Sequence, residues 1–286
     1  MKIFRNVVGA SLLVCSTLVF SQPVDLIKSA ESGNASAQNS LGLMLANGQG
    51  VPQNNVEAAK WFRRAAEQGN IVAASNLGLL LMNGQGVEQN NVEAVKWFRK
   101  AAEQGDSSSQ NRLGWMFQHG QGVAQNNVEA VKWFRRAAEQ RDPYAQNNLG
   151  LMLVNGQGVA QNNVEAVKWF RRAAESGHAE AEYNLGLMLM NGQGVTKDSA
   201  EALKWYRRSA EQGYVLAQNN LGLMLAQGQG VAPDIYQAYI WLSLAASQDS
   251  SYSQSRDYLA QMLTPSQLMK AKDQASKLVK NRLSSR

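Results

Sequence analysis

Cysteine is almost missing from this chain: Cys15 is the only one among 286 residues. A disulfide framework, a CxxC redox pair and a thiolate zinc site are therefore excluded. Histidine is nearly as rare, and neither His119 nor His178 belongs to an HExxH or a Cys/His motif. The sequence also contains no EF-hand loop, so it predicts no metal site. The fold is expected to depend on packing alone.

Catalytic signatures are missing as well. The chain contains no GxSxG nucleophile motif, no SxxK pair and no phosphate-binding loop that ends in GK[ST]. A GQG triplet recurs six times, but without the lysine and hydroxyl residue it fits a turn between helices. We therefore expect no catalytic residues, no cofactor and no enzymatic activity.

Long hydrophobic runs are confined to the N-terminus. Residues 1–5 carry two basic side chains, residues 6–20 are mostly apolar, and the small residue Ser21 follows. This order is typical of a secretory signal peptide. The alternative is a membrane anchor, but the run is shorter than the ~20 residues that a span needs. We predict that residues 1–21, with Cys15, are removed on export to the periplasm or the exterior, and that the mature chain has no transmembrane segment.

An excess of basic residues gives the chain a net charge of +6, from 28 Lys and Arg against 22 Asp and Glu. Without Lys2 and Arg5 the count becomes 26 against 22, or +4. The remaining basic residues recur with a fixed period and form no runs, which is typical of solvated, ion-paired helix faces. We therefore expect no nucleic-acid partner.

A block of 36 residues recurs six times without insertions. Its copies begin at Ala37, Ala73, Ser109, Ala145, Ala181 and Ala217. The string QNNVEAVKWFR is identical in three consecutive copies. A strict period of this length indicates a solenoid of stacked units, which offers an extended surface to a partner.

The first half of each copy predicts a helix with a glycine inside it. In the first copy Ala37, Leu41 and Leu45 recur at helical spacing, and Gly42 lies between them. A helical glycine costs roughly 1 kcal/mol relative to alanine. Because the glycine recurs in all six copies, we expect its bare Cα to permit close approach of another helix. The helix should end near Asn47, before two glycines.

The second half of each copy predicts a helix that begins with a capping box. Asn54 can accept from the first-turn amides, and Glu57 stands three residues later. Gly69 lies where a helix end favours a left-handed residue. Trp61 recurs with the period, on the same stripe as several alanines. We interpret the tryptophans as core residues that pack against small neighbours.

The pattern LGxMLxxGxGV…(N/D)xxEAxKWxRxAAExG resembles the Sel-one-like repeat family over residues 37–252. The resemblance implies a right-handed α/α solenoid of six helix-pair repeats whose first helices line a concave face. It also implies scaffold or adaptor work, which exported bacterial members often perform in envelope assemblies, secretion machinery, cell-wall processes or host contact. Some exported relatives carry a disulfide in each repeat and have been described as binding or cleaving penicillins. This chain lacks those cysteines, so that activity does not carry over.

Both ends of the array are expected to carry caps. Residues 22–36 predict one N-terminal capping helix. In the sixth copy, Ile240, Ser243 and Leu244 replace the basic residues of the other copies. An apolar face at this place needs a cover, which we assign to C-terminal capping helices in residues 253–286. One should span 253–263, and the other should begin at Thr264-Pro265.

The third and fifth copies differ most from the others on their first helices. Two neighbouring registers also carry recurring polar residues, whose amides can bind a peptide backbone. Local repacking and ordinary solvated polar residues are the competing interpretations. The partner-binding candidates are Asn111, Arg112, Trp115, His119, Asn147, Asn148 and Tyr183.

Two functions remain open at this point. The first is a non-enzymatic exported scaffold that binds a protein or an extended peptide on the concave face, in envelope or secretion-machinery assembly. The alternative is a cell-wall or β-lactam-binding protein with weak hydrolase activity. The missing cysteines and the missing serine-nucleophile motif favour the scaffold.

Overall fold

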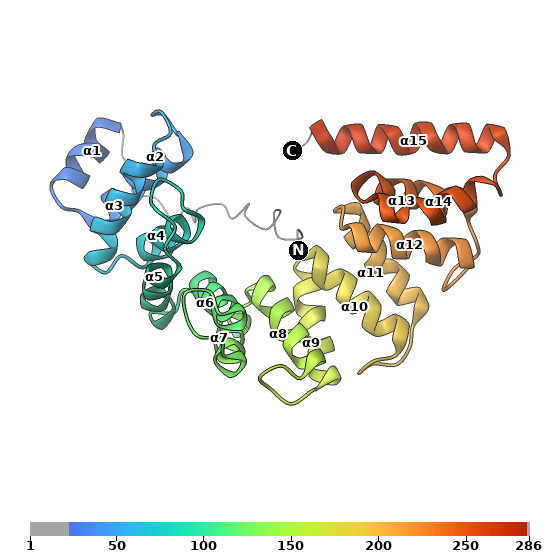
Figure 1. The fold of residues 1–286 in the computed structure, drawn as a ribbon, viewed down its shortest axis with the longest axis horizontal. Coiled ribbons are helices and arrows are strands. Elements are labelled where there is room, and N and C mark those ends of the chain that lie inside the picture. Colours follow the sequence, from blue (N-terminus) through green and yellow to red (C-terminus); the bar gives the residue numbers. More distant parts are fainter. Residues whose placement is uncertain (1–22, 285–286) are drawn as a thin grey trace. The chain divides into compact units, whose positions relative to one another are not determined.

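The computed structural model describes residues 23–284, and in this part of the chain it contains helices and no strands. The expected signal peptide, residues 1–21, lies outside the described residues. The helices follow one another as labelled in Figure 1. Their bounds are α1 Pro23–Glu31, α2 Ala35–Asn47, α3 Asn55–Glu67, α4 Ile71–Asn83, α5 Asn91–Glu103, α6 Ser107–His119, α7 Asn127–Glu139, α8 Pro143–Asn155, α9 Asn163–Glu175, α10 Ala179–Asn191, α11 Ser199–Glu211, α12 Val215–Gln227, α13 Ile235–Gln248, a 3-10 turn η1 Ser250–Tyr252, α14 Ser253–Ala260 and α15 Pro265–Ser284.

The chain divides into two compact units, with the boundary between Gln140 and Arg141. Within each unit, every repeat is a helix pair. The first helix packs against the second helix of its own repeat and against the second helix of the repeat before it, as α4 does with α5 and α3. The all-α solenoid fold predicted from the sequence is confirmed.

The glycine inside each first helix has the purpose that its recurrence suggested. A Cβ on Gly78 would lie 2.8 Å from the ring of Phe98 on the paired helix, and Phe98 is fully buried. The same contact joins Gly42 to Phe62, Gly114 to Phe134 and Gly150 to Phe170, and Tyr206 and Leu242 replace the phenylalanine in the last two copies. The missing Cβ makes room for one large side chain in every repeat.

The tryptophans of the second helices, which the sequence assigned to the core, are buried to different extents. Trp133 and Trp169 are buried, and Trp61 is partly exposed but packs against the core residues at Leu26 and Leu41. Five of the six lie beside a basic residue of their own helix, as Trp61 does with the Arg64 guanidinium at 4.7 Å from its ring centroid. The side chain that faces the helical glycine is the residue after the tryptophan, which fills the centre of the repeat.

The second helices begin at the predicted caps. Asn54 accepts from the Glu57 amide at 3.1 Å, and Asp198 accepts from the Glu201 amide at 2.8 Å. The glutamates also join neighbouring repeats: Glu93 accepts from Arg63 at 2.5 Å, and Glu201 accepts from Arg171 at 2.7 Å. Hydrogen bonding to these arginines holds the pKa of both carboxyls below the usual range.

The GQG turn fixes neighbouring repeats against each other. Its first glycine ends the first helix in a left-handed conformation, as Gly84 does at φ 65°. Its second glycine lies against the start of the previous repeat's second helix. A Cβ on Gly86 would lie 2.2 Å from the carbonyl carbon of Asn55. The turn assignment is confirmed, and the second glycine is needed because backbone meets backbone there.

Buried glutamines at one register of the first helices link neighbouring helices, which the sequence alone did not reveal. Gln38 donates to the Ala30 carbonyl at 3.1 Å and accepts from Gln68 at 2.7 Å. Gln110 and Gln218 make the equivalent bonds, whereas the second copy carries Ala74 at this register. These bonds give a second donor to carbonyl groups at helix C-termini, which also accept from a nearby glycine amide, as the Ala30 carbonyl does from Gly33 at 3.1 Å.

The fifth copy carries an acid at this register. Glu182 is 0% exposed, lies 3.0 Å from the Arg208 guanidinium and accepts from Gln212 at 2.7 Å. Burial raises the pKa of Glu182, and Arg208 opposes that rise. The pair joins the first and second helices of one repeat.

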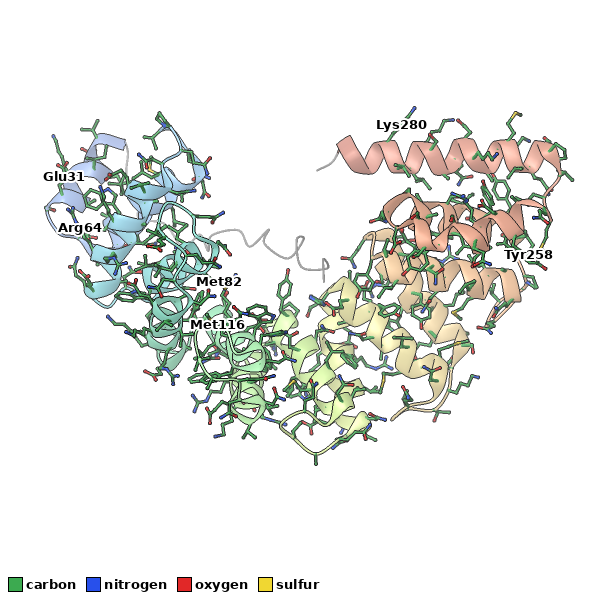
Figure 2. The ribbon with its side chains drawn as sticks, viewed as in Figure 1. Glu31, Arg64, Met82, Met116, Tyr258 and Lys280 are labelled. Carbon is green, nitrogen blue, oxygen red and sulfur yellow. The ribbon has the colours of Figure 1, made fainter. Side chains whose placement is uncertain are left out.

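The last helices cover the end of the array. Ile240 and Leu244 on α13 are 1% and 6% exposed, and α13 packs against both α14 and α15. Figure 2 shows Lys280 on the side of α15 that faces away from α13. At the other end, Leu26 and Ala30 of α1 pack against Leu41 of α2.

Candidate functional site: two patches on the first helices

Trp115 is a partly exposed residue of α6 that stands between two other candidate residues of the same helix. Arg112 precedes it by about one helical turn, and His119 follows it by one. Trp115 and Arg112 are partly exposed and His119 is exposed. We call these three residues the α6 stripe, and we call the surface of the first helices that does not pack on second helices the first-helix face.

Ring stacking orders the α6 stripe. The Trp115 and His119 rings are 4.4 Å apart between centroids, with 26° between their planes. The His119 Nδ1 lies 2.9 Å from the Trp115 carbonyl oxygen. The Arg112 guanidinium lies 6.0 Å from the ring centroid of Phe98. Asn111 is also partly exposed on this helix. Partly exposed tryptophan and arginine side chains are the residue types most often found as anchors at protein interfaces.

The α6 stripe is specific to the third copy. The other copies place Ser or Asn at the position of Arg112, and they place Asn or Gln at that of His119. Leucine occupies the position of Trp115 in all five, at Leu43, Leu79, Leu151, Leu187 and Leu223. Since these leucines occupy the same helical position, the tryptophan is not required for folding at this place.

The other three predicted residues lie in the second unit, and the structure separates their roles. Asn147 is 2% exposed, and its oxygen accepts from Asn184 at 2.8 Å. This buried bond assigns Asn147 to packing between α8 and α10 and removes it from the exposed surface. Asn148 and Tyr183 are partly exposed.

Tyr183 belongs to a group of aromatic side chains. Its ring lies 5.2 Å from that of Tyr214 and 5.7 Å from that of Tyr206, between centroids. Asn220 hydrogen-bonds with both Tyr183 and Tyr206. Tyr252 in η1 is close enough to interact electrostatically with Tyr183 and Tyr214. We call Tyr183, Tyr214, Tyr252 and the neighbouring Glu180 the tyrosine cluster.

Glu180 gives the tyrosine cluster its charge. Partial burial raises the pKa of Glu180, and a hydrogen bond with Asn147 opposes the rise. Burial also raises the pKa of Tyr214, and the Glu180 carboxylate adds to that rise, so the two groups are close together. Among the described residues, no basic side chain forms an ion pair with Glu180.

Sequence reasoning found only Tyr183 of this cluster. The sequence difference that could have revealed the other members lies at the starts of the first helices, when equivalent positions of the copies are compared. The N-cap residues are Asn34, Asn70, Asp106, Asp142, His178 and Tyr214. The residues two positions later are Ser36, Val72, Ser108, Tyr144, Glu180 and Leu216, and Tyr252 stands at the same spacing after Leu216. At the N-cap, Asn and Asp give way to His178 and Tyr214 in the fifth and sixth copies, and at the position two residues later the first large residue is Tyr144 in the fourth copy.

His178 should make the protein sensitive to acid. Its Nδ1 accepts from the Ala181 amide at 3.2 Å and caps α10, and its ring meets that of Tyr144 edge-on. Burial lowers the pKa of His178 to about 4. Since an unfolded histidine titrates near 6.5, the unfolded chain binds the proton first, and stability falls as the pH drops from about 6.5 to 4.

We expect the His178→Asn variant to lose less stability in acid than the parent, by up to about 3 kcal/mol of unfolding free energy. The variant should still cap α10, because Asn34 and Asn70 cap α2 and α4 at the equivalent position. Urea unfolding between pH 7.5 and 4.5 measures the difference. Equal losses in the variant and the parent would contradict the assignment.

Other kinds of site find no support in residues 23–284. No group of three or more His, Cys, Asp or Glu residues there could hold a metal ion. In the same range, the helices are too short or too polar to cross a membrane.

The whole repeat array matches a known family model, described as the Sel1 repeat. The matched segments are residues 35–70, 71–106, 107–142, 143–178, 179–214 and 215–250. No protein with a curated description matches the chain.

Solved structures give the same result. A protective antigen of uropathogenic Escherichia coli, c5321, which displays an SLR fold, is 36% identical with a TM-score of 0.80. The match covers 89% of this chain but only 56% of the antigen, so this chain spans little more than half of its length. A Sel1 repeat protein from Oxalobacter formigenes is 34% identical with a TM-score of 0.70, over 78% of this chain and 95% of that one.

Proposed function

Because the chain belongs to the Sel1 repeat family, we propose that it is a non-enzymatic exported scaffold that binds a protein or an extended peptide on its first-helix face. Proteins of this family are generally non-enzymatic scaffolds that bind other proteins. The site of action would be the periplasm or the exterior, in envelope or secretion-machinery assembly.

One observation carries the proposal. At a position where the other five copies carry a buried or partly buried leucine, the third copy carries the partly exposed Trp115, with Arg112 and His119 on either side. Trp, Tyr and Arg supply most of the binding energy at protein interfaces. A repeat that only needed to fold would have kept the residues of its neighbours, so the change favours contact with a partner.

Reverting this residue to the one that the other copies carry should separate binding from folding. We expect Trp115→Leu to weaken partner binding by about 1–4 kcal/mol and to change the unfolding free energy by less than about 1 kcal/mol. The partner would first be captured from the envelope fraction of the source organism with the mature protein and identified by mass spectrometry. Its affinity for each variant would then be measured.

The control for Trp115→Leu is Lys96→Asn, a change at an exposed position on the second helix α5. It should leave the affinity unchanged. If Trp115→Leu binds like the parent while still folded, the α6 stripe has no part in recognition. A large loss of stability in Trp115→Leu would show instead that the indole is a packing residue.

Export has its own test. The basic residues 1–5 and the apolar residues 6–20 support cleavage after Ser21. N-terminal sequencing of the protein from the envelope or culture fraction should therefore begin near Gln22. Recovery of the intact chain from the cytoplasm, with Met1 in place, would refute export.

A further inference from the structure

We propose that the tyrosine cluster of the second unit is a docking site for an arginine side chain of a protein partner. The inference names the partner's chemistry at one end of the first-helix face, so it rests on the proposed function. It follows from the Tyr183 and Tyr214 rings, whose centroids are 5.2 Å apart, and from Glu180, which stands on α10 about one turn before Tyr183. Glu180 and Tyr252 both interact electrostatically with Tyr214.

The chain itself shows how its aromatic rings are used elsewhere. On the second helices, arginine guanidinium groups lie 4.6–4.8 Å from tryptophan ring centroids, in the pairs Arg64 with Trp61, Arg136 with Trp133, Arg172 with Trp169 and Arg208 with Trp205. Among the described residues, no basic side chain lies over the rings of the tyrosine cluster. These rings therefore retain the negative faces that attract a cation.

The nearby charges complement a cation. Glu180 is partly exposed and forms no ion pair with a described residue. Arg208 on α11 lies over Trp205 and is paired with the buried Glu182. His178, at the start of the same helix as Glu180, has its pKa lowered to about 4 by burial, so it carries no repelling positive charge at neutral pH.

The side chains on either side of Glu180 favour an arginine that is presented on a peptide. Tyr144 is 54% exposed and Leu216 is 38% exposed, and both lie two residues after the N-cap of a first helix, as Glu180 does. Successive first helices therefore offer an apolar ring or side chain on either side of the carboxylate. A guanidinium can contact rings and pair with a carboxylate through several donors, which a lysine ammonium does less well.

The probe is a capped twelve-residue Gly/Ser peptide with arginine at every fourth position. A second peptide carries citrulline at those positions, which keeps the shape of the side chain and removes its charge. A third carries glutamate, because the N-termini of α10 and α12 could instead attract an anion. Binding of each labelled peptide to the full-length mature protein would be measured by fluorescence anisotropy at low and at physiological salt.

The variants are chosen to keep the fold. Glu180→Gln removes only the charge. Tyr183→Asn restores the residue found at Asn39, Asn111, Asn147 and Asn219, and Tyr214→Asn restores the N-cap residue of Asn34 and Asn70. Glu175→Gln, at the exposed end of α9, is the matched control for loss of one negative charge.

We expect the arginine peptide to bind the parent at least about tenfold more tightly than the citrulline peptide. Glu180→Gln should abolish most of this preference, and each tyrosine variant should weaken arginine-peptide binding about fivefold. Glu175→Gln should stay within about twofold of the parent, because the charge of the exposed Glu175 is screened by salt.

Three results would overturn the inference. The first is equal binding of the arginine and citrulline peptides, or no binding of either. The second is tighter binding of the glutamate peptide. The third is an equal effect of Glu180→Gln and Glu175→Gln, which would indicate attraction by net charge alone. None of these results decides the proposed function, which the Trp115→Leu experiment tests in the other unit.

Discussion

Gly86→Ala should lower the free energy of unfolding by about 3 kcal/mol or more, because it adds a side chain where two backbone segments meet. Gly86 has a φ of 70°, where a Cβ costs roughly 1–2 kcal/mol. A Cβ would also lie 2.2 Å from the carbonyl carbon of Asn55 and 2.5 Å from the amide nitrogen of Val56. Backbone atoms at a helix start cannot rotate away, so the repeats must separate.

Gly105 provides the matched control for this substitution. Its φ is 96°, but nothing lies within 4 Å of the place that a Cβ would take. Gly105→Ala should therefore show the backbone cost alone, about 1–2 kcal/mol. Urea unfolding followed by circular dichroism measures both variants. If the two lose the same stability, the contact between the GQG turn and the preceding repeat does not hold the array together.

Removal of residues 253–286 should make the protein aggregate or lose about 3–6 kcal/mol of stability, because it uncovers Ile240 and Leu244 on α13. Full burial of one such side chain contributes about 1.5–3 kcal/mol. The five equivalent residues of Ile240 are exposed lysines, at Lys60, Lys96, Lys132, Lys168 and Lys204. The cover over Ile240 therefore comes from α14 and α15 and not from the repeats.

A rescue variant distinguishes a missing cap from general damage. Ile240→Lys, Ser243→Arg and Leu244→Arg give the truncated chain the residues that the fifth copy carries at these positions. This chain should be monomeric in analytical ultracentrifugation, whereas the simple truncation should not. A monomeric simple truncation that melts with the parent would show that α14 and α15 are not a structural cap.

The candidate site could be predicted only in part from the sequence. Departure from the repeat singled out Trp115, which the structure places at a partly exposed position, because five copies supplied a reference for its position. The sequence could not show that Asn147 is buried, because the residues at the equivalent position of the other copies are buried in some copies and partly exposed in others. The tyrosine cluster was missed because its members stand at three different registers and converge only when helices of successive repeats pack side by side.

The sequence by itself determined the features that depend on local spacing. The Asn and Asp caps and the glycine ends of the helices act within a few residues along the chain, so they could be predicted before the fold was known. The 36-residue period and the apolar change at Ile240 could be read by comparing one copy of the sequence with the next.

Only the tertiary structure decided which side of each helix meets a neighbour. Phe98, and not Trp97, fills the space above Gly78, because one step along a helix turns a side chain by about 100°. The same rotation brings the Gln38 amide to the Ala30 carbonyl at the C-terminal end of α1. It also brings Glu180, Tyr183 and Tyr214 together on one surface. These arrangements depend on how one repeat is rotated against the next, and that rotation is fixed by packing between residues about 30–36 positions apart in the chain.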